Sequence, residues 1–169
     1  DRVALLTSSD GLEATAKAAA FLDTLKELRK AGLTAETTFS LLSTYAQGSI
    51  THLLRANYEQ DWVDRFDGLM FGAFEHFAGF PLDANQRTQL TLRLRDGGFA
   101  FPSARAASAR AYMGSWALVF KSVAACLGVT SVEGFRARCP GTARTLRRAE
   151  AGIQALGGKD SAPFDWAAC

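Results

Sequence analysis

The 169-residue sequence is poor in cysteine and histidine. Its three cysteines stand at uneven spacing with no Cys-x-x-Cys pair, and the chain has only two histidines. This scarcity argues against a zinc site and against a disulfide framework. The thiols of Cys126, Cys139 and Cys169 are therefore expected to be reduced, which favours an intracellular reducing compartment, an organelle included.

Long apolar runs are also missing from the sequence. The longest one, Leu69 to Phe80, is interrupted by Glu75 and His76. A membrane-spanning helix needs about 20 consecutive apolar residues. The stretch therefore predicts a buried amphipathic helix, with no transmembrane segment in the chain.

The motifs of common enzymes are absent too. The sequence contains no Walker-type phosphate loop, no Gly-x-Ser-x-Gly and no His-Glu-x-x-His, and its histidines fall on different expected elements. Asp61, Asp64 and Asp67 share one helical face, but no further acids complete a magnesium shell, so a solvated face is the expected role. We therefore expect no catalytic site, metal, cofactor or small-molecule substrate in this chain by itself.

Apolar residues make up 48% of the chain and charged residues 21%, which is typical of a globular protein. The length suits one domain with a single core. We expect one helical domain over residues 1–158, followed by a loosely ordered tail at 159–169.

The net charge of +2 hides a strong division along the chain. Residues 87–148 hold eleven of the nineteen Lys and Arg residues but only two acids, for a net charge of +9. Residues 1–86 carry a net −5 and the remainder −2. A block that is almost entirely arginine suits phosphate or carboxylate partners, because guanidinium offers a planar fork of donors. Neutralisation of this block by the acidic half of the same chain is the alternative.

Apolar residues recur with a helical period through most of the sequence, so the expected fold is mainly α. About six helices are predicted, with a further turn or two of helix around 50–55 and a short turn at 83–88. The helices are expected near 10–30, 34–47, 61–78, 103–127, 132–138 and 142–156.

One small β-hairpin is expected near residues 90–101. Leu90, Leu92 and Leu94 alternate with polar residues, which is the period of a strand. The following Asp-Gly-Gly supplies the positive backbone φ angles of a tight turn, and 99–101 alternates again. This pattern places Arg93 and Arg95 on one face of a strand.

The segment from 90 to 120 resembles one found late in the reverse-transcriptase-type reading frames of non-LTR retrotransposons. In that family it reads LP-x-R-x-GGLGLRSA, followed by an alanine-rich stretch ending AAYxASWA. The upstream order of helices is also similar, so the resemblance covers roughly residues 1–127. It is carried here by Leu92, Arg93, Gly97, Gly98, Phe99, Phe101, Ser103, Ala104, Ala111, Tyr112, Ser115, Trp116 and Ala117.

The resemblance implies the thumb and the helical region beyond it, without the polymerase palm. The paired aspartates that bind catalytic metal in the family are absent, because no Asp-Asp occurs in the chain. Phe99 and Phe101 replace the usual leucines, and no proline precedes Leu92. Such departures are typical of a diverged or repurposed copy.

A thumb holds RNA or an RNA/DNA duplex by its backbone, so the resemblance implies nucleic-acid binding. Independently of the family, Arg93, Arg95, Arg105 and Arg110 are the best candidates, because strand alternation and helical spacing place them outward. The full set of predicted contacts is Arg93, Arg95, Arg105, Arg110, Lys121, Arg144, Arg147 and Arg148. The alternative function is that of a repurposed helical subunit, with a structural role among other subunits of a larger assembly, an organellar one included.

Overall fold

A computed structural model describes residues 8–157 of the chain. Those residues fold almost entirely into helices, and no strand occurs among them. The chain forms two compact units, described separately below. Among the described residues, unit 1 comprises 8–53 and 59–105, and unit 2 comprises 54–58 and 106–157. The mainly α prediction is therefore confirmed, while the predicted tail at 159–169 lies outside the described residues.

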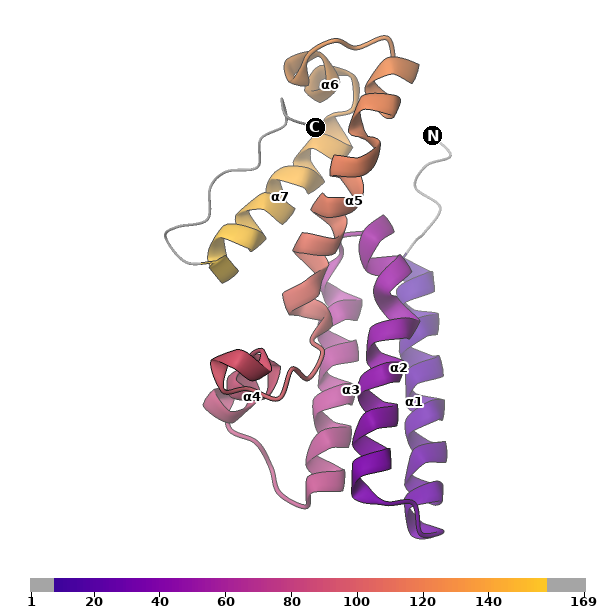
Figure 1. Ribbon diagram of the computed structural model, residues 1–169. Coiled ribbons are helices and arrows are strands. Elements are labelled where there is room, and N and C mark those ends of the chain that lie inside the picture. The colour runs from indigo at the N-terminus through magenta and orange to yellow at the C-terminus, as the bar shows by residue number, and fades with distance from the viewer. Residues whose placement is uncertain (1–7, 158–169) are drawn as a thin grey trace. The chain divides into compact units, whose positions relative to one another are not determined.

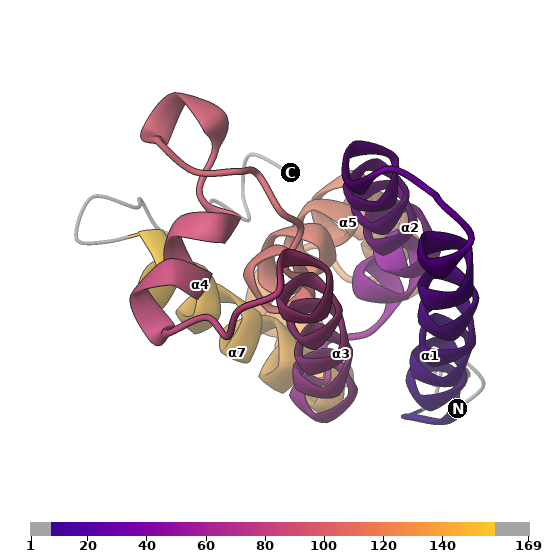
Figure 2. The same cartoon turned by 90° about the horizontal axis from the view of Figure 1, so that it is seen from below.

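Three long helices lie side by side in unit 1 (Figures 1 and 2). They are α1 (Ser8–Lys30), α2 (Ala35–Ala56) and α3 (Gln60–Ala78), of which α2 belongs to unit 1 as far as Leu53. Phe21 of α1 stacks on Tyr45 of α2, with ring centroids 4.1 Å apart, and Phe39 of α2 meets Phe74 of α3. Aromatic contacts therefore join α2 to both of its neighbours.

Helix α1 approaches α3 closely at Gly11. A Cβ placed on Gly11 would overlap the ring of Trp62, which is itself buried. Only glycine gives the indole this space, so the packing of α1 on α3 depends on a residue that otherwise weakens helices. The predicted break between the helix at 34–47 and the helical turns around 50–55 is wrong, because α2 continues through Gly48 to Ala56.

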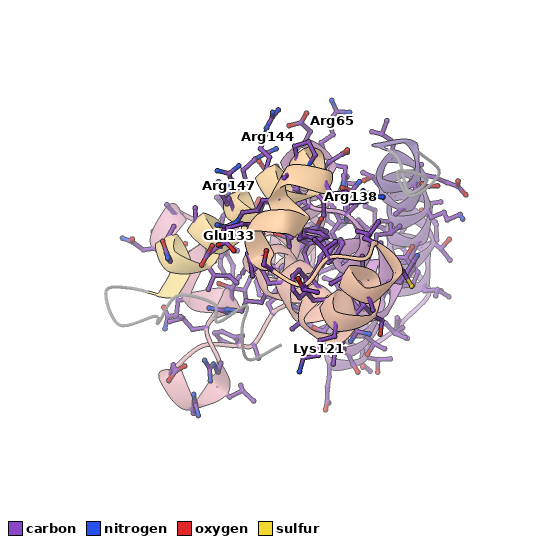
Figure 3. The ribbon with its side chains drawn as sticks, turned by 90° about the horizontal axis from the view of Figure 1, so that it is seen from above. Arg65, Lys121, Glu133, Arg138, Arg144 and Arg147 are labelled. Atoms are coloured by element: carbon purple, nitrogen blue, oxygen red, sulfur yellow. The ribbon has the colours of Figure 1, made fainter. Side chains whose placement is uncertain are left out.

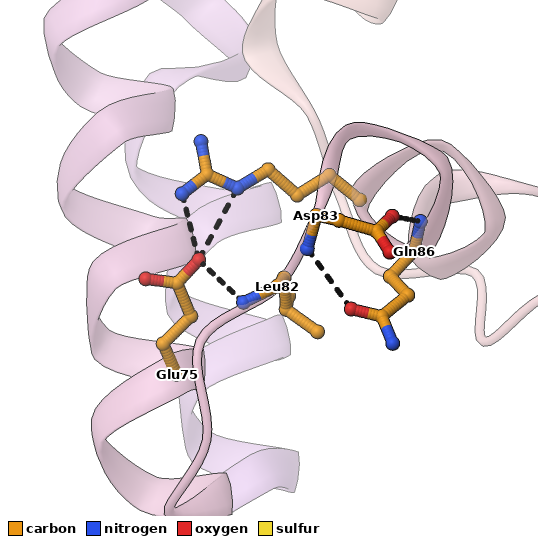
Figure 4. A network of polar contacts seen from close by, with 5 residues as sticks. Glu75, Leu82, Asp83 and Gln86 are labelled. Atoms are coloured by element: carbon orange, nitrogen blue, oxygen red, sulfur yellow. Dashed lines mark hydrogen bonds and ion pairs between the residues drawn. The ribbon is translucent and has the colours of Figure 1, made fainter.

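Helix α4 (Ala84–Thr91) follows α3 after a short loop. Asp83 caps it by accepting a hydrogen bond from the Gln86 backbone N–H, and the Gln86 side chain accepts one from the Asp83 backbone N–H (Figure 4). This reciprocal capping box explains why α4 is longer than the predicted turn at 83–88. One carboxylate oxygen of Glu75, on α3, accepts hydrogen bonds from the Arg87 side chain and the Leu82 backbone N–H (Figure 4). Helix α4 is thereby tied to α3.

The predicted β-hairpin at 90–101 is wrong. Helix α4 runs to Thr91, and a short 3₁₀ helix, η1 (Leu94–Asp96), follows it. The chain does turn back, because Phe101 N–H donates to the Leu90 carbonyl and Ala100 N–H to the Leu92 carbonyl. The alternating leucines do not share a buried face, since Leu90 is 3% exposed and Leu94 is 74% exposed. Without a face to bury, the alternation does not fix a strand.

Unit 2 contains most of α5 (Ala104–Cys126), with α6 (Val132–Arg138) and α7 (Pro140–Gly157) beside it (Figure 1). Ser131 caps α6 through the Gly134 backbone N–H, and Pro140 opens α7, where its missing N–H costs nothing. The core of unit 2 gathers residues from all three helices and from the segment before α3. It consists of Tyr58, Ala109, Tyr112, Met113, Phe120, Phe135, Leu146 and Ala149.

Candidate nucleic-acid interface

Three of the predicted arginines form one face of α7 in unit 2. At about 100° per residue, Arg144, Arg147 and Arg148 fall within about 100° of one another around the helix axis. They point nearly opposite to Ala143, Leu146 and Ala149, which are at most 4% exposed. The packing of α7 on the core of unit 2 therefore turns all three guanidinium groups outward, and all three residues are exposed. These residues are called the α7 arginine face below.

The α7 arginine face has no ion pair with any described carboxylate. Among the described residues, these guanidinium groups make one long hydrogen bond, which Arg147 Nε donates to the Ala143 carbonyl at 3.4 Å. An exposed guanidinium without a carboxylate partner keeps its donors for a ligand.

Helix α6 adds a guanidinium beside this face. Arg136, Arg147 and Glu150 line a shallow hollow whose other lining residues are apolar, Phe120, Phe135 and Leu146 among them. The hollow has a volume of about 10 Å³, which is room for one water at most. It is therefore a seam lined by residues of α6 and α7, Arg136 and Arg147 among them, and it is too small to hold a ligand.

Two predicted cations, Arg110 and Lys121, lie on the part of α5 that belongs to unit 2. Arg110 and Lys121 are both exposed, and neither pairs with a described carboxylate. Figure 3 shows Lys121 on the opposite side of unit 2 from Arg144 and Arg147. Lys121 therefore lies apart from the α7 arginine face.

The predicted arginines of unit 1 are placed differently, because each has a carboxylate of its own chain nearby. Arg93 and Arg95 both lie 3.8 Å from Asp96, measured from Nε to the nearer carboxylate oxygen. Arg105 Nη1 donates to Asp64 Oδ1 at 3.1 Å. Arg93 immediately precedes η1 and Arg95 lies within it, and the strand face that was to align them does not occur among the described residues.

Asp67, three residues after Asp64, has a structural role that the sequence did not reveal. It is 7% exposed and accepts hydrogen bonds from Ser103 Oγ and from the backbone N–H groups of Ala104 and Arg105. Asp67 thus caps the N-terminus of α5 from another helix, where a negative charge is also favourable. Burial raises the pKa of Asp67, while these hydrogen bonds act against the rise. The expected solvated acidic face on α3 is therefore wrong at this residue.

A polar groove of about 300 Å³ lies between α1 and α2 in unit 1. Asp10, Glu13, Lys17, Tyr45 and His52 line it, and the buried Ser49 Oγ beside them has no hydrogen-bond partner among the described residues. Lys17 and Glu13 already pair with each other across one helical turn. None of the predicted binding residues lies in this groove.

The described residues hold no cluster of three or more His, Cys, Asp or Glu side chains arranged to bind a metal ion. Within the same part of the chain, no helix is long and apolar enough to span a membrane.

No family model, curated protein or solved structure matches the chain. The resemblance to the retrotransposon segment rests therefore on the residues given above, and the candidate interface rests on its geometry.

Proposed function

We propose that this chain binds the sugar–phosphate backbone of nucleic acid through the α7 arginine face, as a non-catalytic domain similar to a reverse transcriptase thumb. One observation carries the proposal. Arg144, Arg147 and Arg148 project together from a helix anchored by buried residues, and no described carboxylate pairs with them.

The electrostatics favour a polyanion over a single carboxylate. Residues 132–157 carry five arginines against two glutamates, so α6 and α7 together have a net charge of +3. Contacts to phosphate release condensed counterions, and this gain does not depend on base sequence. An outward row of guanidinium groups suits such backbone binding, because each can fork onto a phosphate.

A second function, that of a structural subunit in a larger assembly, has one observation of its own. Leu118 on α5 is 86% exposed and its neighbour Val119 is 43% exposed. Adjacent apolar side chains in water are typical of surfaces that contact another protein. Replacing Leu118 with Gln separates the two functions, since nucleic-acid affinity should not change while a protein contact should weaken.

The test replaces Arg144, Arg147 and Arg148 together by Gln and measures binding to a duplex of RNA and DNA by filter retention. Loss of three phosphate contacts should weaken binding by at least about tenfold at physiological salt. The matched control replaces Lys26, Arg29 and Lys30 of α1 by Gln, which removes the same charge from unit 1. Lys26 and Lys30 already pair with Asp23 and Glu27. Equal losses of affinity in the two variants would contradict the proposal, because they would show that binding depends on the net charge of the protein and not on the position of these arginines.

A further inference from the structure

The loop that replaces the predicted hairpin exposes apolar side chains to solvent. Leu94 is 74% exposed, Phe99 is 69% exposed and Leu92 is 41% exposed. The two ends of the loop are buried, since Leu90 is 3% and Phe101 is 4% exposed. The apolar tip therefore projects from a well-anchored base. Residues 92–100 are called the aromatic loop below.

The backbone of the aromatic loop is held in one conformation by its own hydrogen bonds. Gly98 N–H donates to the Arg93 carbonyl, and Ala100 N–H donates to the Leu92 carbonyl at 2.8 Å. Gly97 adopts a φ of 79°, and Ala100 adopts 52°, which is costly for a residue with a Cβ. A Cβ on Gly98 would overlap the Leu92 carbonyl. The loop is thus pre-organised, and a ligand that meets Phe99 need not order it first.

Two guanidinium groups lie in the same loop as the exposed ring. The side chains of Arg93 and Arg95 are 68% and 71% exposed, and they share one carboxylate, that of Asp96. Both contacts to Asp96 are 3.8 Å long and exposed, so they hold the guanidinium groups weakly. The same loop therefore carries a net positive charge and an accessible aromatic ring.

An aromatic ring beside cationic side chains is the combination that binds single-stranded nucleic acid. The ring stacks on an unpaired base while the cations contact the flanking phosphates. From this juxtaposition we propose that the aromatic loop binds single-stranded nucleic acid, with Phe99 stacked on a base and with Arg93 and Arg95 on the phosphates. This site lies in unit 1 and uses none of the α7 arginines.

An anionic membrane surface is the competing partner for an apolar tip with arginines. Insertion into lipid would bring the carboxylate of Asp96, which is 49% exposed, among anionic headgroups. Recognition of an anionic membrane typically uses clusters of about four to eight Lys or Arg residues, whereas residues 92–100 hold two arginines and one aspartate. Stacking on a base needs one exposed ring with cations for the flanking phosphates, so the composition of the loop favours a nucleic acid strand.

The test measures, by fluorescence anisotropy, how tightly a single-stranded nucleic acid of twelve nucleotides binds to wild type, F99A, F99L and F99W. Base stacking is worth about 1–3 kcal/mol per base, so F99A should bind about 5- to 150-fold more weakly. F99L keeps the apolar contact but has no ring, and it should lose as much as F99A. F99W should bind at least as tightly as wild type, with its fluorescence quenched by the stacked base. Because residue 99 is largely exposed, all variants should keep the far-ultraviolet circular dichroism of wild type.

Two results would overturn the proposal. One is that F99L binds the single strand as tightly as wild type. The other is that F99A loses binding to vesicles containing phosphatidylserine while its affinity for the single strand stays unchanged. The triple Gln variant of the α7 arginine face serves as the control, because the ratio of F99A to wild-type affinity should be the same in that background. Failure of the backbone-binding function would therefore leave the Phe99 effect measurable.

Discussion

The arginines of the two units differ in their surroundings. In unit 1, Arg87 donates to Glu75, Arg105 donates to Asp64, and Arg93 and Arg95 share Asp96. In unit 2, no described carboxylate pairs with the α7 arginine face. Both sets belong to the same basic block of the sequence. Arginine content alone therefore does not identify a binding surface, because a nearby carboxylate competes with a ligand for the guanidinium group. That competition is stronger at Arg105, 3.1 Å from Asp64, than at Arg93 and Arg95, each 3.8 Å from Asp96.

The largest expected loss of stability comes from removing Asp67, the buried carboxylate that caps α5 in unit 1. Replacing Asp67 with Ala leaves three donors at the start of α5 without an acceptor, and should lower the free energy of unfolding by about 3 kcal/mol. Chemical denaturation measures this change. Asp64, one turn away, is exposed and pairs with Arg105 at the surface, so D64N is the control and should cost less than about 1 kcal/mol. Similar losses in both variants would remove the distinction between a capping and a surface carboxylate.

The second largest expected change in stability comes from two helical glycines, one in each unit, that differ in how closely they are packed. Gly11→Ala drives a methyl group into Trp62 and should destabilise the protein by about 1–3 kcal/mol. Gly114, inside α5 of unit 2, has open space around its Cβ position, so Gly114→Ala should stabilise the helix by about 0.5–1 kcal/mol. Thermal unfolding should therefore show shifts of opposite sign. A stabilising Gly11→Ala would show that α1 does not pack closely on α3.

The smallest expected stability effect is a dependence on pH with opposite signs at two carboxylates of α3. Hydrogen bonds from Arg87 and from the Leu82 backbone lower the pKa of Glu75, so its stabilisation is present at neutral pH and is lost as the pH falls through that lowered pKa. Burial raises the pKa of Asp67, so ionisation of Asp67 costs stability as the pH rises through its folded value. Denaturation at several pH values measures both.

The two variants that check these signs are E75Q and D67N. The stability difference between wild type and E75Q should shrink toward acid, whereas the difference between wild type and D67N should grow toward acid. If the two stability differences changed with pH in the same direction, one of the two pKa shifts would have the wrong sign. Either hydrogen bonding would not lower the pKa of Glu75, or burial would not raise the pKa of Asp67.

The helical fold could largely be predicted from periodicity and end signals. The bounds 132–138 match α6, and the helix expected at 61–78 differs from α3 by one residue. Gly48 misled the prediction because glycine costs only about 1 kcal/mol inside a helix, and the burial of Leu42, Ile50 and Leu53 on either side of it outweighs that cost. Residues 90–101 misled it because alternation describes a strand only when one face is buried, and here only Leu90 and Phe101 of the segment are buried.

The candidate site could be predicted only in part. Spacing alone places Arg144, Arg147 and Arg148 on one face of a helix, and the structure adds that this face is opposite the core. The pairing of Arg105 with Asp64 and the capping by Asp67 join residues more than 35 positions apart, so no local pattern reveals them. Whether an arginine is available is therefore a property of the tertiary structure.

The most direct test of the central claim is the salt dependence of duplex binding in wild type and in the triple Gln variant of Arg144, Arg147 and Arg148. The logarithm of the binding constant falls with the logarithm of salt by about 0.9 for each phosphate contacted. If the α7 arginine face binds the backbone, the triple variant should have a slope shallower by about 2.7. An unchanged slope would show that these three arginines contact no phosphate and would contradict the proposed function.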